Sequence, residues 1–231
     1  MIAVSRHTSW DAIHPDSLLN LAGVRRVTHE FGFLLRHYWM PGTELTYERV
    51  TESTRARIVR RPGKCNADAI WWRETVQDSS DDSVRSVCFC IYDRSAQTFR
   101  TQGILDETIE PESIEDARIQ AFWNQPILTP LLPIPLGFQW HVSAENGYMD
   151  FLLESETTVG DMPVLFVRRY GRFTLDGSGP VEREGITAYA LDRSVVLEDR
   201  TRDRLVDTGQ EAQLTITKLT KSVLLPQDEE E

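Results

Sequence analysis

The stretch Thr43-Glu44-Leu45-Thr46-Tyr47-Glu48-Arg49-Val50 alternates along the chain, with Leu45, Tyr47 and Arg49 at every second position and threonine or glutamate between them. Successive side chains of an extended strand point to opposite faces of a sheet. A period of two is therefore typical of a strand with one buried face. The stretch predicts that the chain enters an antiparallel sheet at residue 43.

Runs of the same kind recur on both sides of a proline-rich segment. They lie at residues 55–59, 69–76, 84–92 and 98–102 before it, and at 138–142, 148–154, 163–170, 185–191, 195–200 and 213–221 after it. Turn-forming groups such as Arg61-Pro62-Gly63-Lys64 and Gly160-Asp161-Met162-Pro163 separate them. We therefore predict a mainly β fold, a strongly curved antiparallel sheet or barrel of about ten strands.

Two segments have a helical pattern instead. Apolar residues recur near helical spacing over 14–39, after a candidate N-cap at Asp16 or Ser17, so residues 1–41 are predicted to form an N-terminal helical segment. Glu110-Pro111 favours a helix start within residues 104–135, which end in several prolines. The sequence thus predicts one helix between two β-meander halves.

The expected organisation is a single antiparallel β domain with short additions at its ends. The domain covers residues 42–226, and its two halves, 42–103 and 136–226, are joined by the helix and proline-rich linker. Residues 227–231 form an acidic tail that we expect to be disordered.

The two halves share a weak internal repeat. Tyr92-Asp93-Arg94-Ser95 lines up with Leu191-Asp192-Arg193-Ser194, and each follows one predicted strand and precedes another. Aspartate and serine accept backbone hydrogen bonds in tight turns. The repeat therefore indicates a hairpin turn used twice, or a duplication of the whole half.

Composition bounds the classes of function. The 231 residues are 40% hydrophobic and 26% charged, as in an ordinary globular protein. The formal net charge of −11 makes this an acidic protein, so we expect no nucleic-acid partner. No stretch reaches the roughly 18 apolar residues of an integral membrane segment. Because no secretory signal is visible, a cytoplasmic location is expected, or a periplasmic one if a leader has been removed.

The residues that most often carry chemistry form no recognisable motif. Cys88 and Cys90 share a face of one predicted strand but lack a second ligand pair, and His29 and His37 are too far apart for a zinc helix. The sequence contains no nucleophile elbow, phosphate loop or dinucleotide fingerprint. We therefore predict no metal site, no cofactor and no catalytic residue.

One pair of acids could act together. Glu154 and Glu156 are two residues apart, so in one strand they would share a face. If that face were interior, the pair could serve as general acid and base. The alternative is a pair of solvent-facing carboxylates.

The second half carries an order of motifs that resembles a known superfamily. Pro133-Ile134-Pro135-Leu136-Gly137-Phe138-Gln139-Trp140 opens it, Gly160-Asp161-Met162-Pro163-Val164-Leu165-Phe166-Val167 follows, and Gly185-Ile186-Thr187-Ala188-Tyr189-Ala190-Leu191 comes later. This order is similar to that of the curved antiparallel half-barrels typified by bacterial lipoprotein carriers and their uncharacterised relatives. The resemblance implies an acyl chain bound in the concavity of the sheet, with the helix around residues 114–123 as a plug.

Three functions are compatible with these patterns. The first is a non-catalytic binding protein that holds an apolar small molecule or acyl chain in the concavity of a curved β-sheet. Its expected ligand-binding residues are Met149, Phe151, Leu153, Val164, Phe166, Ile186, Ala188 and Ala190. The second is a structural or assembly subunit that docks on a protein partner or forms a homo-oligomer. The third is a barrel-type cyclase using Glu154, Tyr189 or Arg168; no motif demands it, so a non-enzyme is favoured.

Overall fold

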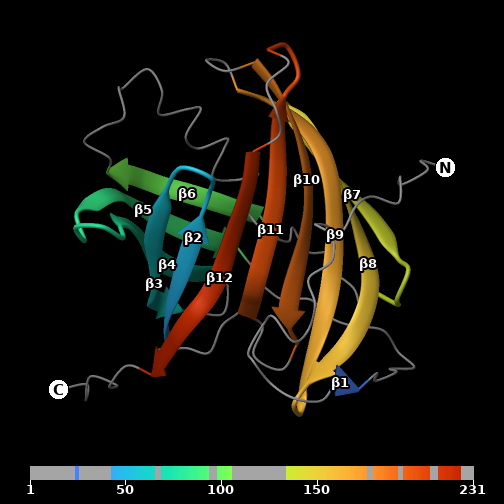
Figure 1. The fold of residues 1–231 in the computed structure, drawn as a ribbon, viewed down its shortest axis with the longest axis horizontal. Helices are drawn as coiled ribbons and strands as arrows, with labels where there is room; N and C mark the ends of the chain where they lie inside the picture. Colours follow the sequence, from blue (N-terminus) through green and yellow to red (C-terminus); the bar gives the residue numbers. More distant parts are fainter. Residues whose placement is uncertain are drawn as a thin grey trace.

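The structure, a computed structural model, describes residues 24–25, 43–65, 69–93, 98–105, 134–175, 179–191, 195–208 and 213–224. These residues form one antiparallel sheet of twelve strands (Figure 1). The prediction of a mainly β fold built on a single antiparallel sheet is confirmed. Among the described strands, no pairing joins the two ends of the sheet, so it is open and not a barrel.

The strands follow the predicted runs with one addition, β1. They are β1 (Val24–Arg25), β2 (Thr43–Val50), β3 (Arg55–Cys65), β4 (Ala69–Asp78), β5 (Val84–Asp93), β6 (Thr98–Leu105), β7 (Gln139–Ala144), β8 (Gly147–Val159), β9 (Met162–Leu175), β10 (Gly179–Ala190), β11 (Val195–Leu205) and β12 (Gln213–Leu224). Their order in the sheet is β1-β8-β9-β10-β11-β12-β2-β3-β4-β5-β6, and β7 also pairs with β8. The last strand, β12, therefore joins the two meanders by pairing with β2.

The two faces of the sheet differ in polarity around β2 and β3. Leu45 and Tyr47 are buried on the face that we call the inner face. The opposite, outer face carries exposed ion pairs such as the one between Arg57 and Asp82, at 2.8 Å. Residues that pair across neighbouring strands point to the same face of the sheet. The pairing that starts from Leu45 and Tyr47 therefore assigns the residues of the other strands to the inner or the outer face.

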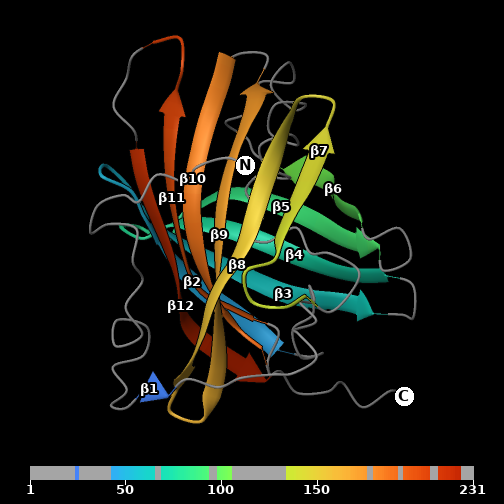
Figure 2. The ribbon, with the colours of Figure 1, turned by 90° about the vertical axis from the view of Figure 1, so that its right-hand side faces the viewer.

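The sheet is curved and does not lie flat (Figure 2). Figure 2 shows the accompanying change of direction, with β3, β4 and β5 running at a steep angle to β8, β9 and β10.

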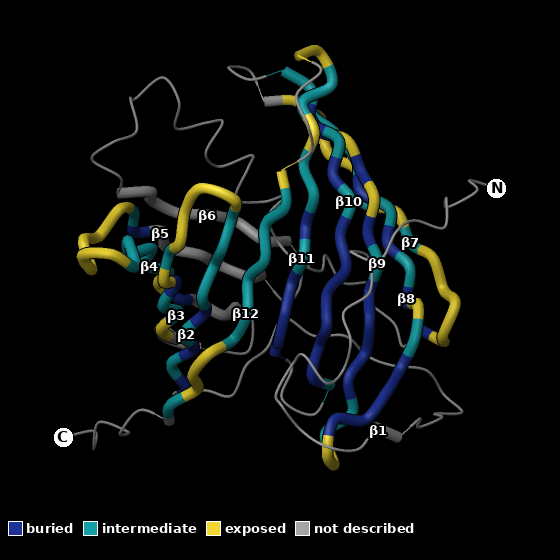
Figure 3. The backbone as a smooth tube through the Cα atoms, viewed as in Figure 1, coloured by how far each residue is buried: buried dark blue, intermediate teal, exposed yellow. Residues whose placement is uncertain are grey.

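Buried apolar side chains form a core on each face of the β8–β11 region, which is largely dark blue in the lower part of Figure 3. The inner core consists of Ile134, Met149, Phe151, Leu153, Leu165, Val167, Phe173, Val181 and Tyr189. The outer core consists of Val159, Val164, Phe166, Ile186, Ala188, Ala190 and Leu197. A smaller cluster near β2 and β3 contains Leu45, Tyr47, Ile58 and Val195. Strands buried on both faces read as continuous apolar runs, as β9 does around Val164.

Several strands are longer than their periodicity predicts. The run predicted to end at residue 200 continues as β11 to Leu205, and β10 begins at Gly179 instead of residue 185. The additional residues are largely charged, and opposite charges face each other across the ladder, as Arg183 and Asp203 do at 2.5 Å. Cross-strand pairs of opposite charge stabilise a sheet, so charge alone does not end a strand.

The predicted helices fall almost entirely outside the described residues. Within 1–41 the structure describes Val24–Arg25 only, and these residues pair with Thr158 and Val159 as strand β1 instead of lying in a helix. The described residues contain no helix, and so none that could cross a membrane. Backbone pairing to the free edge of β8 overrides the helical spacing at this point.

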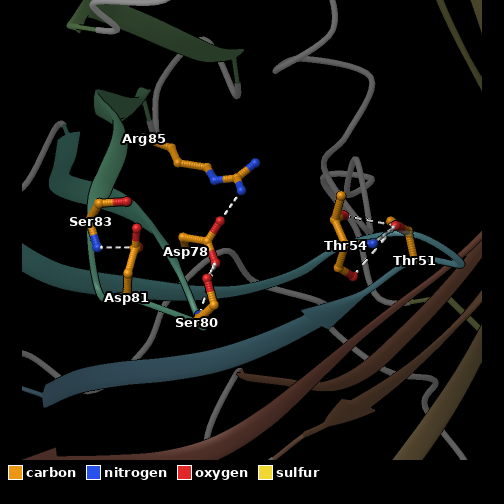
Figure 4. A network of polar contacts seen from close by, with 7 residues as sticks. All are labelled: Thr51, Thr54, Asp78, Ser80, Asp81, Ser83 and Arg85. Atoms are coloured by element: carbon orange, nitrogen blue, oxygen red, sulfur yellow. Dashed lines mark hydrogen bonds and ion pairs between the residues drawn. The ribbon is translucent and has the colours of Figure 1, made fainter.

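Side chains fix the two turns that lead into β3 and β5 (Figure 4). Asp78 accepts hydrogen bonds from the backbone and hydroxyl of Ser80, and it also pairs with Arg85. Thr51 bonds to Thr54 across the other turn, with 2.8 Å between the hydroxyl oxygens. These side-chain bonds add to the backbone hydrogen bonds that Thr51 donates to Thr54 and Asp78 donates to Ser83 across the same turns.

Candidate functional site

The predicted ligand-binding residues are all buried, but they do not share one surface. Met149, Phe151 and Leu153 belong to the inner core. Val164, Phe166, Ile186, Ala188 and Ala190 belong to the outer core. The division follows from strand alternation, since Phe166 pairs with Ala188 on one face while their neighbours point to the other. Only the first group therefore lies on the inner face.

The prediction that Glu154 and Glu156 share a face is wrong. β8 has a bulge between Leu153 and Ser155, which leaves Glu154 without a partner in the ladder with β9. Glu154 lies on the outer face, where Arg168 donates to its carboxylate at 3.0 Å. Glu156 is buried on the inner face. The extra residue changes the parity of the strand, so the two carboxylates do not form an acid–base pair.

The groups named for a cyclase do not converge either. Tyr189 lies in the inner core, whereas Arg168 and Glu154 pair with each other on the outer face. An enclosed pocket would need these groups on one side of the sheet. The described residues therefore bring together no catalytic set among the candidates.

The inner face instead carries arginines, which two matching tripeptides place there. β9 contains Arg169-Tyr170-Gly171 and β10 contains Arg183-Glu184-Gly185. Antiparallel pairing sets Arg169 opposite Gly185 and Arg183 opposite Gly171. Each long side chain thus faces a residue that has none. A Cβ atom at Gly185 would lie 3.0 Å from Nε of Arg169, so the glycine leaves the space that the guanidinium occupies.

Arg169 reaches across β10 to an acid on β11. Its Nη2 donates to Asp199 at 2.7 Å and its Nη1 donates to Thr187 at 3.3 Å. The hydroxyl of Thr187 in turn donates to Asp199 at 2.7 Å. The Arg169 side chain is 1% exposed, so this ion pair is buried and held by a closed set of charge-assisted hydrogen bonds.

Arg183, on the neighbouring strand β10, is bound in a similar way. It donates from Nε and Nη2 to the two oxygens of Asp203, at 2.7 and 2.5 Å. Its guanidinium also lies 5.1 Å from the centroid of the Phe173 ring. Because Phe173 belongs to the inner core, Arg183 joins the apolar part of the inner face to the charged part.

A third pair lies on β3 and β4. Arg60 donates to Glu74 at 2.7 Å and stands 5.0 Å from the centroid of the Tyr47 ring. Burial raises the pKa of Glu74, but the positive charges of Arg60 and Arg49 outweigh this and hold it below its ordinary value. Burial raises the pKa of Tyr47, which Arg60 only partly offsets. Glu74 is therefore ionised and Tyr47 is neutral at pH 7.

Arg49 lies among these pairs without an ion-pair partner of its own. Burial lowers the pKa of its guanidinium, and the charges of Glu74 and Asp199 only partly offset the cost. Among the described residues no carboxylate lies in salt-bridge contact with it and no hydrogen bond to its side chain is formed. The acids nearest to it already bind Arg60 and Arg169.

These groups form one inner charge cluster. Its members are Arg49, Arg60, Glu74, Arg169, Arg183, Asp199 and Asp203. Glu156 is another buried acid of the same face, so four guanidinium groups and four carboxyl groups lie on it. Acids engaged by arginine are poor general bases, so the ion pairs of this face hold the sheet together and offer no acid–base pair.

A stack of aromatic rings runs from the solvent into the inner core. Phe138, 41% exposed, stacks on Trp140 with 6.5 Å between the ring centroids. Trp140 stacks on Phe151, which is buried, at 5.1 Å. Leu136 beside them is also exposed. The edge of the sheet at β7 therefore presents apolar side chains that are continuous with the inner core.

The sequence contains signals for part of this site. The repeated Arg-x-Gly tripeptides at Arg169 and Arg183 would place arginine over glycine once β9 and β10 are known to pair. The alternation with Leu45 and Tyr47 places Arg49 on the inner face, whereas the pairing of Glu74 with Arg60 could not be predicted from local sequence, because Arg60 lies on another strand. Within the described part of the chain, no group of three or more histidine, cysteine or acidic residues could hold a metal ion.

Comparisons with known proteins leave the chain without a family. No family model matches it, and no curated protein does. A Bacteroides fragilis protein thought to be exported, with a YmcC-like fold, aligns over 84% of this chain and 99% of its own, at 9% identity and a TM-score of 0.41. The 12:0-ACP thioesterase from Umbellularia californica aligns over 79% of this chain and 75% of its own, at 8% identity and a TM-score of 0.17.

Proposed function

We propose that the protein is a non-catalytic binding protein that holds an apolar small molecule or acyl chain on the concave, inner face of its curved sheet. The observation that carries the proposal is the aromatic stack from Phe138 through Trp140 to Phe151. Large apolar side chains that are exposed side by side mark a candidate binding surface. An apolar ligand would cover Phe138 and Leu136 and reach the partly buried Trp140 at the rim of the inner core.

The open sheet supports the same function. A closed barrel has no sheet edge, whereas this sheet is open and presents the exposed side chains of Leu136 and Phe138 next to strand β7. Of the residues predicted to bind the ligand, Met149, Phe151 and Leu153 remain the candidates, because they lie in the inner core. The residues of the outer core are reassigned to packing.

Native mass spectrometry of the freshly purified protein tests the proposal directly. The expected result is a complex with one small molecule that organic extraction releases. The extracted protein should then bind N-phenyl-1-naphthylamine, a neutral apolar probe, saturably. Absence of both a retained molecule and saturable probe binding would contradict a binding function, and a defined oligomer with Phe138 in its interface would favour the assembly subunit instead.

A matched pair of surface variants locates the site. Phe138→Asp should weaken probe binding about ten-fold, or about 1.4 kcal/mol, because it places a charge in the apolar edge. Val84→Asp is the control, since Val84 is also an exposed apolar residue, 56% accessible, but lies in β5. Equal affinity of the two variants would place the ligand elsewhere.

A further inference from the structure

We infer that the ligand is a neutral molecule with a flat aromatic ring system, and not an acyl chain, and that it stacks on the exposed ring of Phe138. The inference rests on the proposed function, because it chooses between the two ligand classes proposed for the same edge of the sheet. We call the side chains of Leu136, Phe138 and Trp140 the ring platform. Its accessible area, ring orientation, rigid backbone and lack of charge all favour this class of ligand.

The ring platform offers a small accessible area. Leu136 is 44% and Phe138 is 41% exposed, and Trp140 is partly buried. Behind them, Phe151 is only 2% exposed and Leu153 is fully buried. A long acyl chain would have to extend beyond the platform over this filled core, and ordering its many rotatable bonds costs free energy. A compact, rigid molecule fits on the platform and needs no such ordering.

The rings of the platform share one orientation, which the ring of a ligand can continue. The planes of Phe138 and Trp140 are 24° apart, with 6.5 Å between the ring centroids, and those of Trp140 and Phe151 are 10° apart, at 5.1 Å. Phe138 is the exposed end of this stack. Offset, near-parallel rings attract each other beyond the effect of burying their area. A flat aromatic ligand gains this attraction from Phe138, whereas a saturated molecule of the same size does not.

A tight turn holds Phe138 in a fixed position. Its backbone N–H donates to the oxygen of Pro135 at 3.1 Å, and Gly137 has a φ of 82°, typical of the third residue of a type II turn. The turn is joined to β8, because Gly137 donates to the oxygen of Leu153 at 2.8 Å and Leu153 donates to that of Phe138 at 3.0 Å. The platform is therefore ordered before a ligand arrives, which lowers the cost of binding a rigid ring.

The surroundings of the platform favour an uncharged ligand. Residues 134–140, Ile-Pro-Leu-Gly-Phe-Gln-Trp, contain no charged side chain. On the inner face, the guanidinium groups of Arg169 and Arg183 are bound by Asp199 and Asp203. An ionised group placed against the apolar rings would lose water without gaining a partner of opposite charge from this segment. The ring system should therefore carry no charge where it meets the platform.

The test compares 1-naphthol with decahydro-1-naphthol, which has the same carbon skeleton and hydroxyl group but no aromatic ring. Titration calorimetry measures the affinity of the extracted protein for each compound at pH 7, where both are neutral. The wild-type protein should bind 1-naphthol about two- to ten-fold more tightly, the effect of one stacked pair of rings. Phe138→Leu keeps an apolar side chain but removes the ring, so the two affinities should become nearly equal.

Leu136→Ala is the matched control within the platform, because it removes apolar area but no ring. It should weaken the binding of both compounds and leave the ratio of their affinities unchanged. The natural ligand gives an independent measurement, since the molecule released by organic extraction should absorb in the near ultraviolet, as a conjugated ring system does.

The outcomes separate this inference from the proposed function. Equal affinity of the wild-type protein for the two compounds overturns the preference for an aromatic ring, and an unchanged ratio in Phe138→Leu overturns stacking on that residue. Release of an aliphatic molecule such as a fatty acid overturns the ligand class, while the binding function stands. Absence of a retained molecule, together with failure of both compounds and of N-phenyl-1-naphthylamine to bind, overturns the binding function itself.

Discussion

Gly185 leaves space for the side chain of Arg169 on the neighbouring strand. It is placed opposite Arg169 in the ladder, and the guanidinium crosses the position where a side chain would be. A Cβ atom there would lie 2.9 Å from the backbone oxygen of Arg200 as well as 3.0 Å from Nε of Arg169. The backbone contact cannot be relieved by a rotamer change, so the glycine is required by close approach on two sides.

We therefore expect Gly185→Ala to destabilise the protein. Overpacking a well-filled position costs about 1–3 kcal/mol, and this substitution would also press on the Arg169 ion pair. The free energy of unfolding in urea measures the effect. Glu184→Ala, one residue earlier on the outer face, is the control and should change stability by no more than about 0.5 kcal/mol. Equal stability of the two variants would mean that Arg169 does not lie over the glycine.

Glu74 makes stability depend on pH. Its folded pKa lies below the ordinary value of 4.5, because Arg60 and Arg49 outweigh the effect of burial. A carboxyl group with a depressed folded pKa contributes stability that is fully present above its unfolded pKa. That contribution is lost as the pH falls through the folded pKa.

Glu74→Gln should therefore lower the free energy of unfolding at pH 7, where the wild-type ion pair is intact. The difference between variant and wild type should narrow as the pH falls below about 4.5, because the wild-type carboxylate becomes protonated there. Urea unfolding at a series of pH values measures this. Glu145→Gln, in the exposed turn after β7, is the control. A difference that stays constant down to pH 3 would contradict the assignment.

At the scale of the strand, the bulge in β8 decides which acid faces inward. Glu154 is the residue without a ladder partner, and the positions on either side of it pair regularly with β9. Removing it would leave Leu153, Ser155 and Glu156 in uninterrupted alternation, with Leu153 and Glu156 still on the inner face. The bulge is thus an insertion that the rest of the sheet does not need.

Deletion of Glu154 should accordingly be tolerated. The expected loss is about 1 kcal/mol, the contribution of a partly exposed ion pair with Arg168. Deletion of Val167, at a regular position of β9, is the matched control, since it moves every later residue of the strand to the opposite face and should prevent folding. Circular dichroism and urea unfolding distinguish the two. A Glu154 deletion as damaging as the Val167 deletion would contradict the register.

The strands also show which features of the fold sequence periodicity can predict and which it cannot. The alternation around Leu45 and Tyr47 was enough to predict a strand and its buried face, which the structure confirms. It could not reveal the bulge beside Glu154, because one extra residue leaves no trace in composition. It also predicts too early an end for β11, at residue 200, because the partner that neutralises Asp203, Arg183, comes from another strand. The local sequence pattern therefore predicts the strands, whereas the positions of the buried ion pairs depend on which strands pair in the sheet.

For the whole molecule, β12 is the strand that makes one sheet out of two meanders. It pairs with β11 through Glu198–Asp203 on one side and with β2 through Thr43–Val50 on the other. The inner charge cluster spans this junction, because Arg49 belongs to β2 while Arg183 and Asp199 belong to β10 and β11. A stop after Thr208 would remove β12 and leave two unpaired strand edges.

Without β12, the two meanders should therefore fail to associate. We expect the protein ending at Thr208 to lose amide-exchange protection in β2–β5, to unfold without a single cooperative transition, and to aggregate through its exposed edges. A protein ending at Leu225, which keeps every described strand, is the control and should match the full chain. Each inner-face ion pair lies within one half, Arg60 with Glu74 in the first and Arg169 with Asp199 in the second, so it is the backbone pairing of β12 that holds the halves together. Unchanged protection and cooperativity after removal of β12 would show that the halves are independent, and the inner face could then not act as one binding surface.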